Sequence, residues 1–75
     1  MISALVLINC RFPFDTKIVD ELNKLSAVNM VYRTTGIYDL IVKINADTEN
    51  DLRKTVCADI SMIHNVSSTV TMVIA

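Results

Sequence analysis

The chain is poor in the residues that usually build disulfide frameworks, metal centres and tight turns. Its 75 residues include two cysteines, one histidine, one glycine, one proline and no tryptophan. Cys10 and Cys57 allow at most one disulfide. Neither cysteine belongs to a C-x-x-C pair, and His64 is the single histidine, so the sequence indicates no metal site. The chain also lacks a nucleophile elbow and a Gly-rich phosphate loop. We therefore expect no cofactor, and the sequence names no reaction.

A surplus of positive charge and a long apolar run are also missing. Seven Lys/Arg against eight Asp/Glu give a formal net charge of −1, whereas a protein that binds nucleic acid on its own normally shows a basic surplus. The longest apolar run, Ala4 to Ile8, is far shorter than the roughly 20 residues of a membrane-spanning helix, and the N-terminus lacks the features of a secretory signal. We expect a cytoplasmic protein with reduced thiols and with no membrane or direct nucleic-acid partner.

Apolar residues are abundant. They make up 52% of the chain against 20% charged residues, which excludes a disordered protein. The length allows one small domain, which we expect to span residues 1–75. Domains of this size bury only about 60% of the surface that their unfolded chain exposes, so they usually need a disulfide, a metal or self-association. Because the first two are poorly supported here, we expect oligomerisation.

The first half of the chain predicts a strand, a helix and a second strand. Ile2–Cys10 is apolar on both alternating faces, which is typical of a doubly buried strand. Pro13 breaks this run, and Asp15 is expected to cap the helix that follows. The apolar residues of that helix recur at helical spacing: Ile18, Leu22 and Leu25. The segment Val28–Thr34 then alternates like a half-buried strand, with Val28, Met30 and Tyr32 in phase.

The second half repeats this order. A tight turn at Thr35-Gly36 leads into a strand over Tyr38–Ala46, and strands joined so closely should form an antiparallel hairpin. Thr48 begins a second helix in a capping box with Asp51, and this helix is expected to end at His64. Its apolar residues are Leu52, Val56, Ile60 and Ile63. The last strand, Val66–Ile74, has Val66, Val70, Met72 and Ile74 in phase.

This order of elements predicts an α+β fold in which a four-stranded antiparallel sheet carries both helices on one face. The first and third strands are expected at the centre and the second and fourth at the edges. The other face of the sheet is then open, and its mixed aliphatic, hydroxyl and charged residues favour a sheet-to-sheet dimer over a half-solvated sheet. The pattern does not fix the phase of the first strand. The predicted dimer interface is Leu5, Leu7, Val31, Arg33, Ile41 and Val73, with Thr69 and Thr71 on the same face.

Asp39 is the most suggestive polar residue, because Asp is disfavoured in strands and this one follows the Gly36 turn. Its carboxylate is suited to bind the ammonium group of a small ligand. Free N–H groups of the turn would bind the carboxylate of the same ligand. The alternative is a surface Asp paired with Arg33 or Lys43. Tyr38 either closes a pocket or packs against the helices.

The remaining polar residues also have structural interpretations. Four threonines either line a polar pocket or are present for their β-propensity: Thr34, Thr35, Thr69 and Thr71. Cys10 and Cys57 are interpreted as small core residues, and His64 as a helix-end residue that bonds to the last carbonyl groups.

The stretch Tyr32–Asp47, with Thr35-Gly36-Ile37-Tyr38-Asp39-Leu40 at its centre, resembles the V-x-x-T-G-x-Y-D-L-x-V-x-V-x-A-x-D segment of the Lrp/AsnC regulators. That segment belongs to their effector-binding half, often called the RAM domain (regulation of amino-acid metabolism). Val66–Val73 is similar to the closing T-x-T-x-x-V strand of the same domain. The resemblance therefore covers essentially the whole chain.

The resemblance implies a ferredoxin-like βαββαβ sandwich of the dimeric α+β barrel type. It further implies dimers that pack sheet against sheet, rings of four or five dimers (octamers or decamers), and amino-acid effectors bound between neighbouring dimers. The matching effector residues are Thr35, Gly36, Tyr38 and Asp39, with Thr69 and Thr71 as second contributors. Because full-length regulators carry an N-terminal helix-turn-helix and this chain begins at the first strand, we expect a stand-alone form, unable to read DNA, with full-length relatives as candidate partners.

Three hypotheses for the function follow. The first is an amino-acid-sensing oligomerisation module that modulates transcription or amino-acid metabolism. The second is a structural or interaction oligomer without a ligand. The third is a small enzyme of the dimeric α+β barrel type, against which stands the expected place of His64 at a helix end and not in a cavity.

Overall fold

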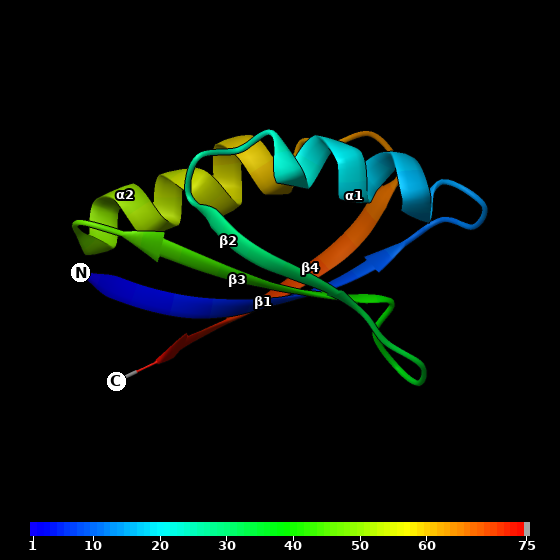
Figure 1. The fold of residues 1–75 in the computed structure, drawn as a ribbon, viewed down its shortest axis with the longest axis horizontal. Helices are drawn as coiled ribbons and strands as arrows, with labels where there is room; N and C mark the ends of the chain where they lie inside the picture. Colours follow the sequence, from blue (N-terminus) through cyan, green and yellow to red (C-terminus); the bar gives the residue numbers. More distant parts are fainter. Residues whose placement is uncertain (75) are drawn as a thin grey trace.

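The computed structural model describes residues 1–74 (Figure 1). Their elements follow one another in the predicted order, and the second helix continues from an α-helical into a π-helical segment. The elements are β1 (Ile2–Cys10), α1 (Asp15–Asn23), β2 (Val28–Arg33), β3 (Leu40–Ala46), α2 (Glu49–Lys54), η1 (Thr55–Ile60) and β4 (Val66–Ile74). Within residues 1–74, no helix has the length and apolar character needed to cross a membrane.

The strands form one antiparallel sheet in the order β2-β3-β1-β4. β1 and β3 are therefore central, as predicted, and β2 and β4 are the edges. Figure 1 shows both helices above one face of the sheet, with the other face uncovered. The predicted ferredoxin-like α+β fold is confirmed.

The core lies between the helices and the sheet. Alternate residues of β1 and β3 point into it because side chains of a strand alternate between its two faces. The helices contribute residues at helical spacing. The buried core consists of Ala4, Val6, Ile8, Ile18, Leu22, Leu40, Val42, Ile44, Leu52, Val56 and Ile60. No polar or charged residue within residues 1–74 is buried, so burial of apolar surface is the main stabilising interaction of this core.

The two helices begin differently. Phe14 is the N-cap residue of α1, and its side chain forms no capping hydrogen bond. Asp15 is the first residue of the helix, and its carboxylate pairs with Arg33, so the prediction that Asp15 caps this helix is wrong. Thr48 caps α2 as predicted, because its Oγ1 accepts a hydrogen bond from the Asp51 N–H at 3.1 Å.

The second helix ends earlier than predicted. In η1 the turn widens, and the N–H of Ser61 donates to the carbonyl oxygen of Val56 at 2.9 Å. The helix therefore ends at Ile60, and His64 lies exposed in the segment that follows. Asn65 then takes a left-handed conformation with φ of 73° before β4 begins. The prediction that the helix ends at His64 is wrong.

Both edge strands contain an irregularity that changes their phase. The pairing of β2 with β3 shifts between Val28 and Met30, and the pairing of β4 with β1 shifts between Asn9 and Cys10. One extra residue in a strand moves every later side chain to the other face. Val28 and Val66 pack against the core, whereas the residues beyond each irregularity lie on the face opposite to the predicted one.

This register corrects the predicted open face. Residues directly opposite each other in an antiparallel pair point to the same face. Arg33 lies opposite buried Leu40, for example, and Val73 lies opposite buried Ala4. The predicted placement on the open face is therefore wrong for five residues that lie on the helix side: Val31, Arg33, Thr69, Thr71 and Val73.

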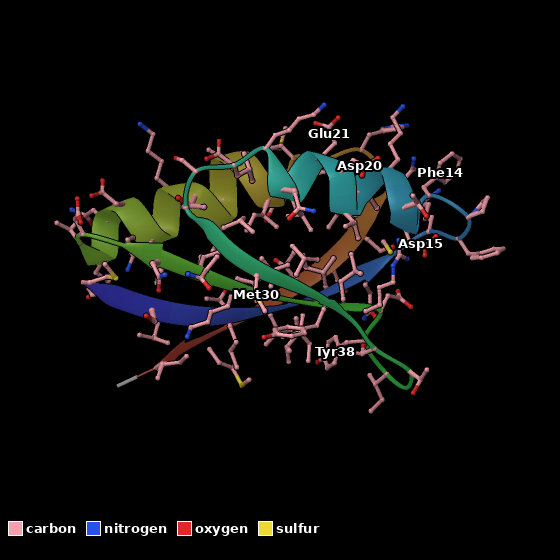
Figure 2. The ribbon with its side chains drawn as sticks, viewed as in Figure 1. Phe14, Asp15, Asp20, Glu21, Met30 and Tyr38 are labelled. Atoms are coloured by element: carbon pink, nitrogen blue, oxygen red, sulfur yellow. The ribbon has the colours of Figure 1, made fainter. Side chains whose placement is uncertain are left out.

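The open face is largely apolar. In the central strands, Leu5, Leu7 and Ile41 alternate with the core residues and so lie on this face. Figure 2 shows side chains projecting from the side of the sheet away from the helices. Its apolar members are Leu5, Leu7, Met30, Tyr32, Ile41, Val70, Met72 and Ile74.

Candidate functional site

The loop between β2 and β3, residues 34–39, is closed by hydrogen bonds at its base. The N–H of Thr34 donates to the carbonyl oxygen of Asp39 at 3.0 Å, and the Thr34 hydroxyl donates to the carbonyl oxygen of Tyr38. Gly36 lies at the tip with φ of 122°, a conformation that side chains disfavour. The predicted antiparallel hairpin is confirmed, but a loop over residues 34–39 replaces the predicted tight turn, and the third strand begins at Leu40 and not at Tyr38.

Asp39 is attached to β1 through both its backbone and its side chain. Its N–H donates to the carbonyl oxygen of Ile8 at 3.0 Å, and its Oδ2 accepts a hydrogen bond from the N–H of Cys10 at 2.9 Å. Among residues 1–74 it forms no ion pair with Arg33 or Lys43, so that alternative is wrong. The carboxylate is instead fixed at the end of the central strand.

Arg33 connects the end of β2 to the start of α1. Its guanidinium forms an ion pair with the Asp15 carboxylate, and its Nη2 donates to the Thr16 hydroxyl at 3.3 Å. The Arg33 and Asp15 side chains are 52% and 31% exposed, so solvent screens this pair. A guanidinium has five N–H donors, which leaves donors for a ligand as well.

These residues surround a small hollow at one end of the sheet, where Figure 2 shows Asp15 at the beginning of α1. The hollow has a volume of about 220 Å³ and is lined by Cys10, Phe12, Asp15, Arg33, Thr34 and Asp39. Pockets for drug-sized ligands measure about 300–1,000 Å³, so this one suits a smaller ligand. We refer to it as the Asp39 hollow.

The electrostatic character of the Asp39 hollow is acidic. Its lining carries two carboxylates and one guanidinium, which sum to a formal charge of −1. Burial raises the pKa of the Cys10 thiol, and the carboxylates of Asp39 and Asp15 raise it further, against the opposing effect of Arg33. At Cys10, the negative charges therefore outweigh the positive one.

The structure brings only one of the predicted effector residues into this hollow, namely Asp39. Thr35 and Gly36 are exposed on the loop, and Tyr38 is half-buried beside Asp39. Thr69 lies on β4 opposite Ile8, on the helix side. Thr71 lines a separate hollow of about 250 Å³ beside α2 and η1.

Sequence reasoning missed four residues of the hollow: Cys10, Phe12, Asp15 and Arg33. They belong to three separate segments, and no short-range motif connects them. The available signal was topological, because β1 and β2 both end, and α1 begins, at the same end of the sheet.

The other predicted residues lie elsewhere. Cys57 is exposed on η1, so its interpretation as a core residue is wrong, whereas Cys10 is half-buried against the core; both thiols are free. His64 lines a hollow of about 310 Å³ between α1 and the segment after η1, together with Phe14 and Met62. No group of three or more His, Cys, Asp or Glu within the described part of the chain is placed to hold a metal ion.

The family follows from a comparison of the sequence with models of known protein families. The model described as the Lrp/AsnC ligand binding domain matches residues 3–75. The chain belongs to this family. The resemblance found in the stretch Tyr32–Asp47 is thereby confirmed. Among curated proteins, no match to the chain was found.

Solved structures with the Lrp/AsnC domain fold match the whole chain. FFRP-DM1 has a TM-score of 0.97 at 28% identity, with 100% of both chains covered. TTHA0845 from Thermus thermophilus has a TM-score of 0.95 at 29% identity, covering 100% of this chain and 94% of that one. A transcriptional regulator of Neisseria meningitidis in complex with L-Met shares the fold, with a TM-score of 0.88 at 16% identity, covering 99% of this chain and 49% of that one. The Lrp/AsnC family points to a regulatory, effector-binding domain and not to an enzyme.

Proposed function

We propose that this Lrp/AsnC domain is an amino-acid effector-binding and oligomerisation module, and that the effector binds at the Asp39 hollow. The observation that carries the proposal is the Asp39 carboxylate, held at the end of β1 in a hollow of about 220 Å³ that Arg33 also lines. Both groups of an α-amino acid have a partner of opposite charge there. The Neisseria meningitidis regulator, about half of whose chain shares this fold, forms a complex with L-Met, which is consistent with an amino-acid effector.

In the proposed binding mode, the effector's ammonium group binds the Asp39 carboxylate and its carboxylate binds Arg33. Charge-assisted hydrogen bonds of this kind are short and about twice as strong as neutral ones. The loop residues Thr35, Gly36 and Tyr38 would contribute backbone groups. Because Thr69 and Thr71 lie outside the hollow of their own chain, they would contact an effector only from a neighbouring subunit.

We further propose that two copies pack through their open faces, and that the dimers form octameric or decameric rings. The open face supports this proposal because large apolar side chains on it remain exposed, among them Met30 at 45% and Met72 at 46%. Contiguous apolar patches of this kind usually mark an interface. Among the predicted interface residues, Leu5, Leu7 and Ile41 lie on this face, in the two central strands.

The module would regulate transcription or amino-acid metabolism through effector-dependent assembly, or through mixed assembly with full-length Lrp/AsnC regulators in the cytoplasm. The formal net charge of −1 supports a role without direct DNA binding, since phosphate contacts require a basic surface.

Light scattering combined with titration calorimetry tests both parts of the proposal. The mass of the purified protein is measured with and without each of the twenty amino acids, and the heat of binding is measured in parallel. We expect a multiple of the 8.4 kDa chain, and at least one amino acid that binds and changes the mass or stability of the assembly. An assembly that releases no heat with any amino acid at millimolar concentration would instead support a ligand-free structural oligomer.

A further inference from the structure

The acidic character of the Asp39 hollow bears on which amino acids it accepts. Asp15 lines the hollow from α1, and Asp39 lines it from the β2–β3 loop. The single positive charge of Arg33, which pairs with Asp15, neutralises only one of these two carboxylates. An α-amino acid with a neutral side chain adds no net charge. A side-chain carboxylate adds a second negative charge to a hollow that already carries one.

We propose that the Asp39 hollow selects effectors with a neutral or basic side chain and excludes aspartate and glutamate. This inference rests on the proposed function of the same hollow. Asp15 is the specificity-determining residue, because Asp39 is required for the ammonium group and Arg33 for the carboxylate of any amino acid. Like charges placed together repel one another, which is a common source of selectivity, and at this exposed site the repulsion is strongest at low ionic strength.

The Cys10 thiol supports this assignment from inside the hollow. Burial raises its pKa most, and the Asp39 and Asp15 carboxylates raise it further, whereas Arg33 lowers it by a smaller effect. The two carboxylates that oppose ionisation of the thiol would also repel the side-chain carboxylate of an incoming ligand. The field within the hollow therefore disfavours an added anion, although Arg33 is present.

Isosteric pairs of amino acids provide the sharpest test, because glutamine and glutamate, or asparagine and aspartate, differ in charge and hardly in shape. Calorimetry at low ionic strength measures the dissociation constant of each, together with that of methionine and lysine, for the wild-type protein. We expect the tightest neutral or basic ligand to bind about tenfold more tightly than the tightest acidic one, a difference of about 1.4 kcal/mol. A ratio below threefold overturns the inference.

Two variants then assign the selectivity to Asp15. Asp15→Asn removes the charge and keeps an oxygen that accepts a hydrogen bond from Arg33, so we expect the preference for neutral over acidic ligands to fall at least threefold. Asp20→Asn removes the same charge from an exposed position on α1 outside the hollow and should leave the preference unchanged. Equal effects of the two variants would overturn the role of Asp15.

The outcomes also separate this inference from the proposed function. Binding of glutamate and glutamine with equal affinity contradicts the selectivity alone and leaves an effector site in place. Absence of binding by any amino acid contradicts the proposed function, and the selectivity with it.

Discussion

The Asp39 carboxylate holds the last residue of β1, because its Oδ2 accepts a hydrogen bond from the Cys10 N–H at 2.9 Å. Cys10 lies beyond the last residue of β1 that pairs with β3, so the carboxylate satisfies a donor at a strand end. The second carboxylate oxygen, Oδ1, accepts no hydrogen bond from a backbone N–H within residues 1–74. One oxygen of Asp39 thus fixes the β2–β3 loop, and the other is available to a ligand.

This division of roles predicts different effects for two substitutions of Asp39. Asp39→Asn keeps an oxygen for the Cys10 N–H but loses the charge, so effector affinity should fall at least tenfold while the free energy of unfolding changes by less than about 0.5 kcal/mol. Asp39→Ala loses both, and the unpaired Cys10 N–H should lower the free energy of unfolding by about 1 kcal/mol. Calorimetry and urea unfolding at fixed protein concentration measure the two effects.

Asp47→Asn is the matched control, since Asp47 is an exposed carboxylate outside the hollow. It should bind effectors like the wild type. Loss of affinity in Asp47→Asn to the same extent as in Asp39→Asn would show a non-specific effect of charge and contradict the assignment of Asp39.

The open face predicts a second result. Leu7 lies in the central strand β1 and points away from the helices, so Leu7→Lys places a charge in the middle of the proposed sheet-to-sheet interface. We expect the mass measured by light scattering to fall at least twofold, towards the 8.4 kDa of a single chain.

Val73→Lys is the matched control for that variant. Val73 was predicted in the same interface, but its pairing with Ala4 places it on the helix side, where it is 56% exposed. The variant should retain the wild-type mass. If Leu7→Lys keeps the wild-type mass and Val73→Lys loses it, then the helix side and not the open face forms the dimer.

The fold was predictable because long periodic segments identify elements well. Ile2–Cys10 and Val66–Ile74 have the predicted bounds, and the apolar spacing from Leu52 to Ile60 predicted the buried face of the second helix. The errors in the predicted sheet faces share one cause: each edge strand contains an irregularity near its start. When the alternation is counted from Val28 or from Val66, the sheet face assigned to that residue is right, and the face assigned to the residues beyond the shift is inverted. No residue near either shift distinguishes a bulge from a regular strand.

The site was predictable only in part, for a different reason. Local sequence identified Asp39 because Asp is unusual in the strand predicted there, although the structure places Asp39 in the loop just before β3. Its neighbours in the hollow are ordinary residues of other segments, such as Arg33 at the end of β2 and Asp15 at the start of α1. Their ion pair depends on where the elements end in space, which periodicity does not give.

The two thiols provide a third prediction. The raised pKa of Cys10 leaves less thiolate at a given pH, so at pH 8 an alkylating reagent should modify Cys10 more slowly than exposed Cys57. In Cys57→Ser, which isolates Cys10, adding Asp39→Asn should accelerate alkylation because one carboxylate that raises the pKa is removed. Mass spectrometry of time points measures both rates. Equal rates with and without Asp39 would contradict this coupling.

The same pKa predicts the direction of a pH effect on stability. An acidic group whose pKa is higher in the folded than in the unfolded state stabilises the fold as long as the group is protonated in both states. This stabilisation is lost as the pH rises past the pKa of the unfolded state, which is about 8.5 for a free cysteine. The free energy of unfolding of the wild type should therefore fall above about pH 8.5 more steeply than that of Cys10→Ala. Urea unfolding at a series of pH values measures the difference.

Gly36 provides the fifth prediction. Its φ of 122° is unfavourable for a residue with a side chain, yet a Cβ added there would meet no atom within 4 Å. The effect of Gly36→Ala is therefore confined to the backbone, and the free energy of unfolding should fall by about 1–2 kcal/mol. Thr35→Ala, at the exposed neighbouring position, should change it by less than about 0.5 kcal/mol. A more stable Gly36→Ala protein would show that the loop tip adopts an ordinary φ in solution, because removing a glycine stabilises a site only where its conformation suits alanine.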